Sequence, residues 1–214
     1  DGKKVETVRT ADVETRDIVR MMVGQELSSE HPISTKQQEQ REVLRVEHLT
    51  RQPAFTNVSL QACQGEILGI TGVIGAGKTE LARAIFGADG PDSGQVFLDG
   101  QPCQIHSPQE AVRYGIGMLP EDRKRLGLLL KQEVYKNLSI AALDQFIRHH
   151  ILRTAQELRA TEDVVKQLDI KISSPYQAVQ YLSGGNQQKI VIGKWLTAQP
   201  RILIMDEPTR GIDV

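Results

Sequence analysis

The sequence predicts an α/β protein with a mostly parallel core sheet, an antiparallel β edge and a helical subdomain. Strand-like and helix-like segments alternate from residue 43 onward, which is the order typical of layered α/β domains. A glycine-rich loop at 72–79 joins a predicted strand to a predicted helix. The run "RILIMDE" is apolar on both faces, as expected of a strand buried in a parallel sheet.

The composition is that of an ordinary globular protein, and it argues against several other classes. Of the 214 residues, 39% are hydrophobic and 25% are charged, and the formal net charge is -1. This balance provides no overall basic field that would hold nucleic acid. Cys63 and Cys103 match no metal or redox spacing, so a reduced, cytosolic compartment is expected. The longest apolar runs are far shorter than the ~20 residues that a membrane helix needs.

Residues 1–27 are predicted to form a small unit of their own. The alternating segment "KKVETVR" precedes a short helix near 15–23, in which Ile18 and Met22 share one apolar face. Nothing close in the sequence would bury that face. Residues 28–42 contain one aliphatic side chain and a proline among polar residues, which is a composition typical of a linker.

Residues 43–214 are predicted to form the main domain. Two edge strands, "VLRVEHL" and "TNVSL", come first, and the apolar run "EILGI" is predicted as a strand that leads into the glycine loop. A helix is predicted from 78 to 86, followed by strands in "GQVFLDG" and "GIGMLP" and by a helical stretch over roughly 134–169. The last helix is predicted in "SGGNQQKIVIGKWL" and the last strand in "RILIMDE".

The loop at 72–79 has the pattern G-x-x-x-x-G-K-[ST] of a phosphate-binding loop. Glycines allow positive φ angles and carry no Cβ, so consecutive N–H groups can turn towards phosphate oxygens in front of the helix. Lys78 can reach the β and γ phosphates, and the Thr79 hydroxyl can bind Mg²⁺. The alternative is a chance glycine-rich turn, and the predicted strand–loop–helix order argues against it. The predicted nucleotide-binding residues are Gly72, Val73, Ile74, Gly75, Ala76, Gly77, Lys78 and Thr79.

Two carboxylates, Asp206 and Glu207, stand at the end of the last predicted strand. Ligands of open α/β sheets bind outside the carboxyl ends of the strands, so both side chains are expected to face the phosphate loop. We expect Asp206 to hold Mg²⁺ through water and Glu207 to act as the general base for an attacking water. The alternative is a solvated acidic turn, and the phosphate loop elsewhere in the chain favours the catalytic interpretation.

A second glycine-led helix start follows at 182–189, in the segment "LSGGNQQK". Ser183 is suited to cap this helix, and Gly184 and Gly185 leave its first N–H groups uncovered. The segment therefore predicts either a second anion site or simply a well-capped helix. One nucleotide needs only one glycine cradle, so a second cradle makes sense if it closes over a nucleotide held by another domain.

The segment "LSGGNQQK" resembles the signature sequence of ATP-binding cassette (ABC) ATPases, and it lies between the phosphate loop and "ILIMDEP" as in that family. The resemblance covers 43–214 and implies two cassettes packed head to tail, with each ATP between the phosphate loop of one and the signature of the other. It also implies a helical subdomain over about 121–185, with Glu121 at the Q-loop position and Asp213 as the D-loop aspartate. The residues that it places against the partner's ATP are Leu182, Ser183, Gly184, Gly185, Asn186 and Gln187.

A narrower resemblance is to the ATPase subunits of bacterial ribose, galactose and xylose importers, which carry two cassettes on one chain. "VRMMVGQEL" is similar to the end of their first cassette, and "LPEDRKRLGL", "LSGGNQQK" and "DEPTRGIDV" are similar to parts of their second. Residues 1–27 would then be the C-terminal remnant of a first cassette. Residues 43–214 would be a second cassette that is incomplete at its C-terminus.

The function implied by this resemblance is the hydrolysis of ATP, with Mg²⁺, to drive monosaccharide import. The protein is expected at the cytoplasmic face of the inner membrane, as a peripheral subunit. The implied partners are a second cassette on the same full-length chain, transmembrane permease subunits and, indirectly, a sugar-binding protein. No nucleic acid is expected among them.

Two features depart from the family pattern. Glu121 is a carboxylate where many cassettes carry a glutamine, and a carboxylate cannot donate a hydrogen bond as an amide does. No histidine follows the acidic strand, so the family's switch histidine is missing, and this chain alone is expected to hydrolyse ATP poorly. Phe55 is the only candidate to stack on adenine, and a core role is the stronger expectation for it.

Three other interpretations stay open from the sequence. A soluble ABC-type ATPase of translation or DNA repair would lack the "MMVG" join, and a repair member would carry a long coiled-coil insertion that is not seen. An unrelated phosphate-loop GTPase or kinase is the second, although the N-K-x-D motif of GTPases is not present. A binding module without catalysis is the third, if Glu121 prevents turnover.

Overall fold

The computed structural model describes residues 4–9, 13–14, 17–18, 21 and 41–209. The chain divides into two compact units, residues 1–39 with Val214 and residues 40–213. In the first unit, residues 17, 18 and 21 are helical, as predicted for 15–23, whereas residues 4–9 form no strand. The rest of that helix, Met22 included, and most of the predicted linker lie outside the described residues. No helix in the described part of the chain is long and apolar enough to span a membrane.

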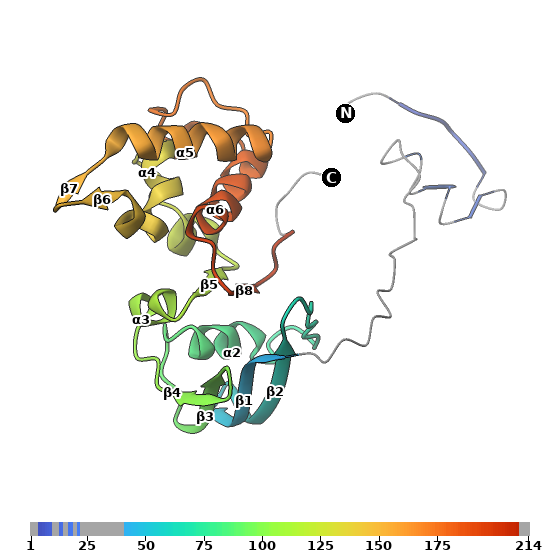
Figure 1. Cartoon of the computed structure of the whole chain (residues 1–214). Helices are drawn as coiled ribbons and strands as arrows, with labels where there is room; N and C mark the ends of the chain where they lie inside the picture. Colours follow the sequence, from blue (N-terminus) through green and yellow to red (C-terminus); the bar gives the residue numbers. More distant parts are fainter. Residues whose placement is uncertain (1–3, 10–12, 15–16, 19–20, 22–40, 210–214) are drawn as a thin grey trace. The chain divides into compact units, whose positions relative to one another are not determined.

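A four-stranded antiparallel sheet opens the second unit, in the order β2–β1–β3–β4 (Figure 1). Its strands are β1 (Glu42–Arg51), β2 (Phe55–Cys63), β3 (Ser93–Leu98) and β4 (Gln101–Cys103), and α2 (Lys78–Ile85) packs against it. The predicted antiparallel edge is thereby confirmed. Phe55 is buried in the core between sheet and helix, which is the role that the sequence favoured. The buried side chains of that core are Leu44, Val46, Leu49, Phe55, Leu81, Ala84, Ile85 and Val96.

The parallel part of the fold consists, within residues 41–209, of the pair β5 (Ile116–Leu119) and β8 (Ile202–Met205). A short helix, α3 (Pro108–Arg113), precedes β5. Leu119 lies opposite Met205 at the carboxyl ends of the two strands. Because the strands are parallel, the residues that follow them leave the sheet at the same edge, which places Glu121 and the acidic strand end at 206–207 on that edge.

The strand predicted in "EILGI" is not formed, and this prediction was wrong. Residues 66–70 have no regular structure, and Ile67 and Ile70 are 98% and 52% exposed. A strand needs a neighbour that takes up its backbone hydrogen bonds. In the described part of the chain β8 pairs only with β5, and no strand pairs with 66–70. The apolar sequence of 66–70 suits a strand, but it does not determine whether a neighbouring strand is present to pair with it.

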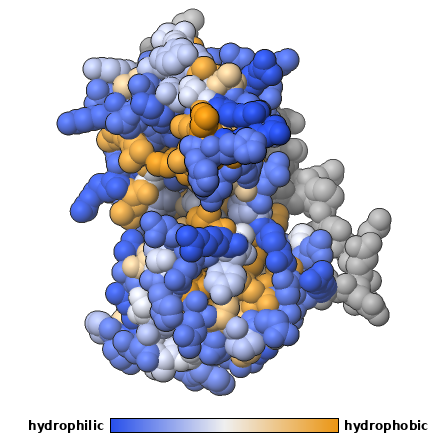
Figure 2. Space-filling model, turned by 60° about the vertical axis from the view of Figure 1, so that its left-hand side comes forward, coloured by the Kyte–Doolittle hydropathy of each residue, from blue (hydrophilic) through white to orange (hydrophobic). Residues whose placement is uncertain are grey.

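Large aliphatic side chains are exposed elsewhere on the described surface as well. Figure 2 shows such apolar groups, in orange, on both the helical half and the sheet half of one face, among mostly polar neighbours. The exposed large aliphatic residues of the described chain include Leu126, Leu129 and Ile151. Surface aliphatics of this kind are common, so they carry no argument about function by themselves.

The remaining elements form a mainly helical part of the same unit, drawn in yellow to red in Figure 1. The single helical stretch predicted for 134–169 is interrupted, because the hairpin β6–β7 breaks it. His149 and His150 form the turn of this hairpin with positive φ angles of 50° and 64°, which an α-helix does not tolerate. The elements are η2 (Arg123–Gly127), α4 (Val134–Ser139), η3 (Ile140–Phe146), β6 (Ile147–Arg148), β7 (Ile151–Leu152), α5 (Thr154–Gln167), η4 (Val179–Tyr181) and α6 (Gly184–Ala198).

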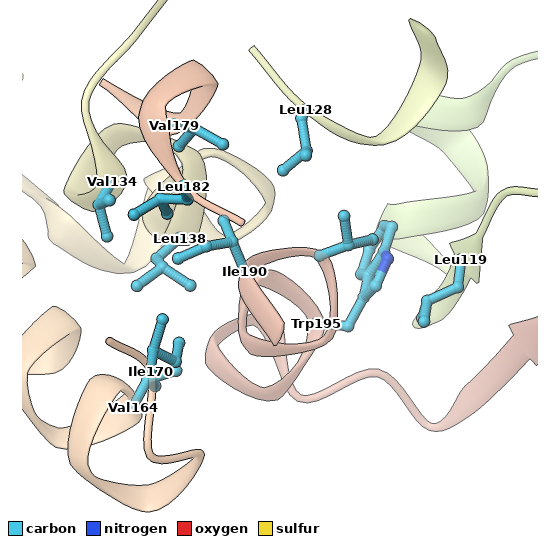
Figure 3. Close-up of a cluster of buried hydrophobic side chains, with 11 residues drawn as sticks. Leu119, Leu128, Val134, Leu138, Val164, Ile170, Val179, Leu182, Ile190 and Trp195 are labelled. Carbon is cyan, nitrogen blue, oxygen red and sulfur yellow. The ribbon is translucent and has the colours of Figure 1, made fainter. Parts of the chain in front are cut away.

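Helix α6 is central to the core of this part, as Figure 3 shows. Ile190 of α6 lies beside Leu138 of α4, and Val164 of α5 belongs to the same buried cluster. Trp195, farther along α6, lies beside Leu119 at the end of β5. Gly193 is required there, because a Cβ atom would lie 2.7 Å from atoms of both Leu138 and Val164. Trp195 also donates a hydrogen bond from Nε1 to the Met118 carbonyl oxygen at 2.9 Å, which fastens α6 to β5.

Candidate nucleotide site

The phosphate loop leads into α2 without a side chain capping the helix. Gly75 and Gly77 both have φ 82°, and residues 72–76 are exposed. A Cβ atom on Gly77 would lie 2.4 Å from the Ala54 carbonyl oxygen, so only glycine fits beside β2 at this point. The first N–H groups of α2 are therefore left for a ligand, in front of the positive end of the helix dipole.

The phosphate loop folds over the Lys78 ammonium group and is hydrogen-bonded to it. Lys78 Nζ donates hydrogen bonds to the carbonyl oxygens of Gly72 at 3.0 Å and Val73 at 3.1 Å. The positive charge of Lys78 thus lies at the loop itself, where phosphate oxygens would compete with the two carbonyls as acceptors. Thr79 is the next residue and is partly buried in the first turn of α2.

The acidic strand end carries a buried carboxylate oxygen without a partner. Asp206 is 8% exposed, and its Oδ2 atom is buried and has no hydrogen-bond partner. Its backbone N–H donates to the Leu119 carbonyl oxygen at 3.0 Å, which fixes the residue against the end of β5. A buried oxygen left unsatisfied in this way fits a group that binds a hydrated cation.

The donor set fits Mg²⁺ only together with phosphate oxygens. In the described part of the chain no group of three or more His, Cys, Asp or Glu side chains could hold a metal ion by itself. Asp206 and the Thr79 hydroxyl would supply two oxygen ligands, and Mg²⁺ is commonly completed by water and substrate phosphates. This is the arrangement expected of a nucleotide site rather than of a resident metal centre.

Glu207 and Glu121 follow the two parallel strands at the same edge. Glu207 is exposed and has φ 45°, a left-handed conformation that is uncommon for a residue other than glycine. Glu121 comes two residues after Leu119, which lies opposite Met205, and it is half-buried. The carboxylates predicted for the acidic strand end and for the Q-loop position therefore belong to one edge of one sheet.

The second glycine-led helix start is α6, and it is capped by a side chain. The Ser183 Oγ atom accepts hydrogen bonds from the Asn186 backbone N–H at 3.4 Å and from Asn186 Nδ2 at 3.0 Å. Gln187 donates from Nε2 to the carbonyl oxygens of Val179 and Leu182, at 3.2 and 3.3 Å. A Cβ atom on Gly185 would meet nothing within 4 Å, so the space beside this glycine is open.

The predicted site residues fall into two sets in the structure. The phosphate loop belongs to the sheet part with α2, and residues 182–187 belong to the helical part with α6 (Figure 1). Asp213 lies outside the described residues. One further residue was missed by the sequence analysis: Gln188, whose Nε2 donates to the Pro208 carbonyl oxygen at 2.9 Å. The only signal for it was a second adjacent glutamine near the start of a helix whose other buried residues carry no polar side chain except Gln187 and the indole of Trp195.

Comparison with known proteins gives consistent matches. The profile of the family described as "ABC transporter" matches residues 55–210. The chain is 44% identical to the ribose import ATP-binding protein of Geobacillus kaustophilus, with all of this chain and 43% of that protein covered. It is 45% identical to a ribose import ATP-binding protein of Rubrobacter xylanophilus, again over all of this chain and 43% of the relative. The chain thus spans less than half the length of these curated relatives.

Solved structures share the fold. A dimeric ATP-binding cassette in a post-hydrolysis state, bound to ADP and Pi, matches with a TM-score of 0.65 and 22% identity, covering 79% of this chain and 76% of that one. A nucleotide-free ATP-binding cassette from an ABC transporter matches with a TM-score of 0.62 and 23% identity, covering 80% and 71%. At this identity the likeness shows the fold alone, which agrees with the predicted α/β cassette.

Proposed function

This chain belongs to the ABC transporter family, and from that premise we propose that it binds and hydrolyses ATP to drive the import of a monosaccharide. The observation that carries the proposal is the uncapped start of α2, where the Lys78 ammonium lies against the Gly72 and Val73 carbonyls. The names of the relatives, which are ribose import ATP-binding proteins, support a sugar as the cargo. They give no support to a soluble cassette of translation or DNA repair.

ATP binding would use the residues of the loop in distinct ways. The amides of 72–79 receive the phosphates, and Lys78 exchanges its two carbonyl acceptors for β and γ phosphate oxygens. The Thr79 hydroxyl and Asp206 hold Mg²⁺. When bound, the metal ion neutralises negative charge that develops on the transferred phosphoryl group.

Hydrolysis would use the carboxylate after the strand. Glu207 accepts a proton from water as the water oxygen bonds to the γ phosphorus and the bond from that phosphorus to the ADP oxygen breaks. Asp206, the residue before Glu207, is held by its backbone hydrogen bond to Leu119. Glu207 therefore lies at the same sheet edge as Asp206, the proposed metal ligand. Glu121, at the Q-loop position, follows β5 at the same edge, and its carboxylate would accept a hydrogen bond from the attacking water.

The second anion site serves a neighbouring cassette in this proposal. Ser183 and the amides of Gly184 and Gly185, supported by Asn186 and Gln187, would meet the γ phosphate held by the partner's phosphate loop. The curated relatives are more than twice as long as this chain, which leaves room for a second cassette on the same full-length chain. Permease subunits, a sugar-binding protein and a peripheral position at the cytoplasmic face of the membrane complete the proposed assembly.

The test of this function is the change Glu207→Gln in the complete protein. Removing the base should lower phosphate release by about 100-fold or more while ATP binding is kept, and it should stabilise a closed pair of cassettes. Phosphate release and the binding of a fluorescent ATP analogue measure the two effects. Glu162→Gln, which changes an exposed carboxylate of α5, is the control and should leave both unchanged. An unaltered hydrolysis rate in the Glu207→Gln protein would contradict the assigned role.

A further inference from the structure

Two adjacent glutamines of α6 are both almost fully buried. Gln187 and Gln188 are each 4% exposed, in a helix whose other buried side chains are mostly apolar. Buried amides are expected to have specific partners, because an unpaired one is costly. The Nε2 groups of the two side chains find acceptors in opposite directions, whereas the buried Gln187 Oε1 atom has no hydrogen-bond partner. Gln187 bonds back to the segment that precedes its own helix, whereas Gln188 bonds across to the end of β8.

The Gln188 contact is one of two hydrogen bonds that flank Glu207 in the chain. One residue before it, the Asp206 N–H donates to the Leu119 carbonyl oxygen at 3.0 Å. One residue after it, the Pro208 carbonyl oxygen accepts from Gln188 Nε2 at 2.9 Å. Between these two hydrogen bonds Glu207 has φ 45°, a conformation that persists in a residue with a side chain only when its surroundings hold it. Gln188 therefore contributes to fixing the backbone of this carboxylate.

We propose that Gln188 is a positioning residue for Glu207 and that it links hydrolysis in one ATP site to engagement of the other. The inference rests on the proposed function, in which the start of α6 meets a nucleotide held by a partner cassette. Ser183 and Gln188 stand on the same helix, about one and a half turns apart, so a displacement of its start is carried to Gln188. The amide of Gln188 passes that displacement to Pro208 and so to the turn that presents Glu207.

The alternative is a purely structural role, in which Gln188 only fills space in the core. The two roles separate in steady-state kinetics of the complete protein. Gln188→Leu removes the donor at similar volume, so a positioning role predicts a kcat for ATP hydrolysis about tenfold lower, with KM for MgATP changed less than about twofold. A purely structural role predicts a lower melting temperature without that selective loss of kcat.

Gln187→Leu is the matched control, since this residue is equally buried on the same helix but bonds to Val179 and Leu182. It should loosen the segment in front of Ser183, and the expected result is a raised KM for MgATP with a smaller change in kcat. If both variants shift kcat and KM alike, or if Gln188→Leu has the kcat of the unchanged protein, the positioning role is wrong.

A double variant tests whether Gln188 acts through Glu207. In the Glu207→Gln protein, adding Gln188→Leu should cause no further loss of the residual rate, because the group that it positions is already gone. An additional tenfold loss would overturn the inference. Should Gln188→Leu fail to fold, Gln188→Asn decides by the same criteria, since it keeps the amide but withdraws it from Pro208.

The Glu207→Gln variant distinguishes a failure of the proposed catalytic role of Glu207 from a failure of the positioning role of Gln188. If Glu207→Gln itself retains full hydrolysis, the proposed catalytic role of Glu207 fails. If Glu207→Gln abolishes hydrolysis while Gln188→Leu and Gln188→Asn behave like the unchanged protein, only the positioning role of Gln188 fails.

Discussion

In the described part of the chain two helices, α2 and α6, begin at glycine-rich segments, and they differ in whether a side chain caps their first N–H groups. Helix α2 starts after Gly77 with no side-chain cap, in a loop that is exposed over 72–76. Helix α6 starts after Ser183, whose hydroxyl accepts two hydrogen bonds from Asn186. The first start leaves its N–H groups without a cap, whereas the second is capped by a side chain of the chain itself.

The glycines at the two helix starts also differ in whether the fold requires them. Gly77 is required by its positive φ and by the close approach of the Ala54 carbonyl, so its role belongs to the fold as well as to the ligand. Gly185 lies in a regular helix beside open space, where a methyl group would disturb nothing in this chain. The fold of this chain therefore requires glycine at 77 but not at 185, which fits the contact with a partner's nucleotide that we propose for Gly185.

The largest expected difference concerns the lysines that follow the two starts. Lys78→Ala should weaken ATP binding by about 100-fold, because it removes the ammonium that lies at the phosphate loop. Lys189→Ala is the matched change on α6, where Nζ donates to the Asp169 carbonyl oxygen, and it should alter ATP affinity less than about threefold. Equilibrium binding of a fluorescent ATP analogue measures both. Equal losses would remove the distinction between the two helix starts.

The next difference is in stability. Gly77→Ala should lower the free energy of unfolding by on the order of 2 kcal/mol, because the new Cβ meets Ala54 and φ is positive. Gly185→Ala should leave it unchanged or raise it by about 0.5 kcal/mol, since alanine favours a helix. Urea unfolding of this chain measures the two values. A destabilised Gly185→Ala protein would show that this glycine, too, is needed by the fold.

A smaller effect separates capping from ligand binding at Ser183. Ser183→Ala should cost about 1 kcal/mol of unfolding free energy because it removes the cap of α6. Ser183→Asp keeps a capping oxygen and should restore that stability, but its charge would repel a triphosphate. ATP hydrolysis by the complete protein should therefore fall in both variants. Hydrolysis that recovers along with stability in Ser183→Asp would mean that the residue is a cap and nothing more.

The smallest expected effect is a pH dependence from α6. Burial lowers the pKa of Lys194 to about 8, even though its Nζ donates to the Gly127 carbonyl oxygen at 2.9 Å and lies 5.1 Å from the Trp195 ring. The unfolded chain keeps this proton to a higher pH, so the free energy of unfolding should rise by on the order of 1 kcal/mol between about pH 7 and about pH 9.

Lys194→Met provides the comparison for that measurement. Urea unfolding at both pH values should show the rise in the unchanged chain and not in the variant, because other groups contribute equally to both proteins. The same rise in the Lys194→Met protein would assign the pH dependence to another group.

The features that the sequence determined are those in which a few neighbouring residues set the outcome. The pattern at 72–79 specifies a glycine loop before a helix, and the Ser183 cap with its two glycines specifies the start of α6, because caps and turns are made within about four residues. The strand-like segments "VLRVEHL" and "TNVSL" likewise predicted β1 and β2, since the periodicity of a strand assigns its faces without reference to the partner strand.

Only the tertiary structure decided which segments meet. The same apolar character that suits 66–70 to a strand left Ile67 exposed in the described chain, because a strand forms only where another backbone completes its hydrogen bonds. The contact of Gln188 with Pro208, and the arrival of Glu121 and Asp206 at one sheet edge, join residues far apart in the sequence. Such contacts depend on how β5, β8 and α6 pack together, and no local pattern contains that information.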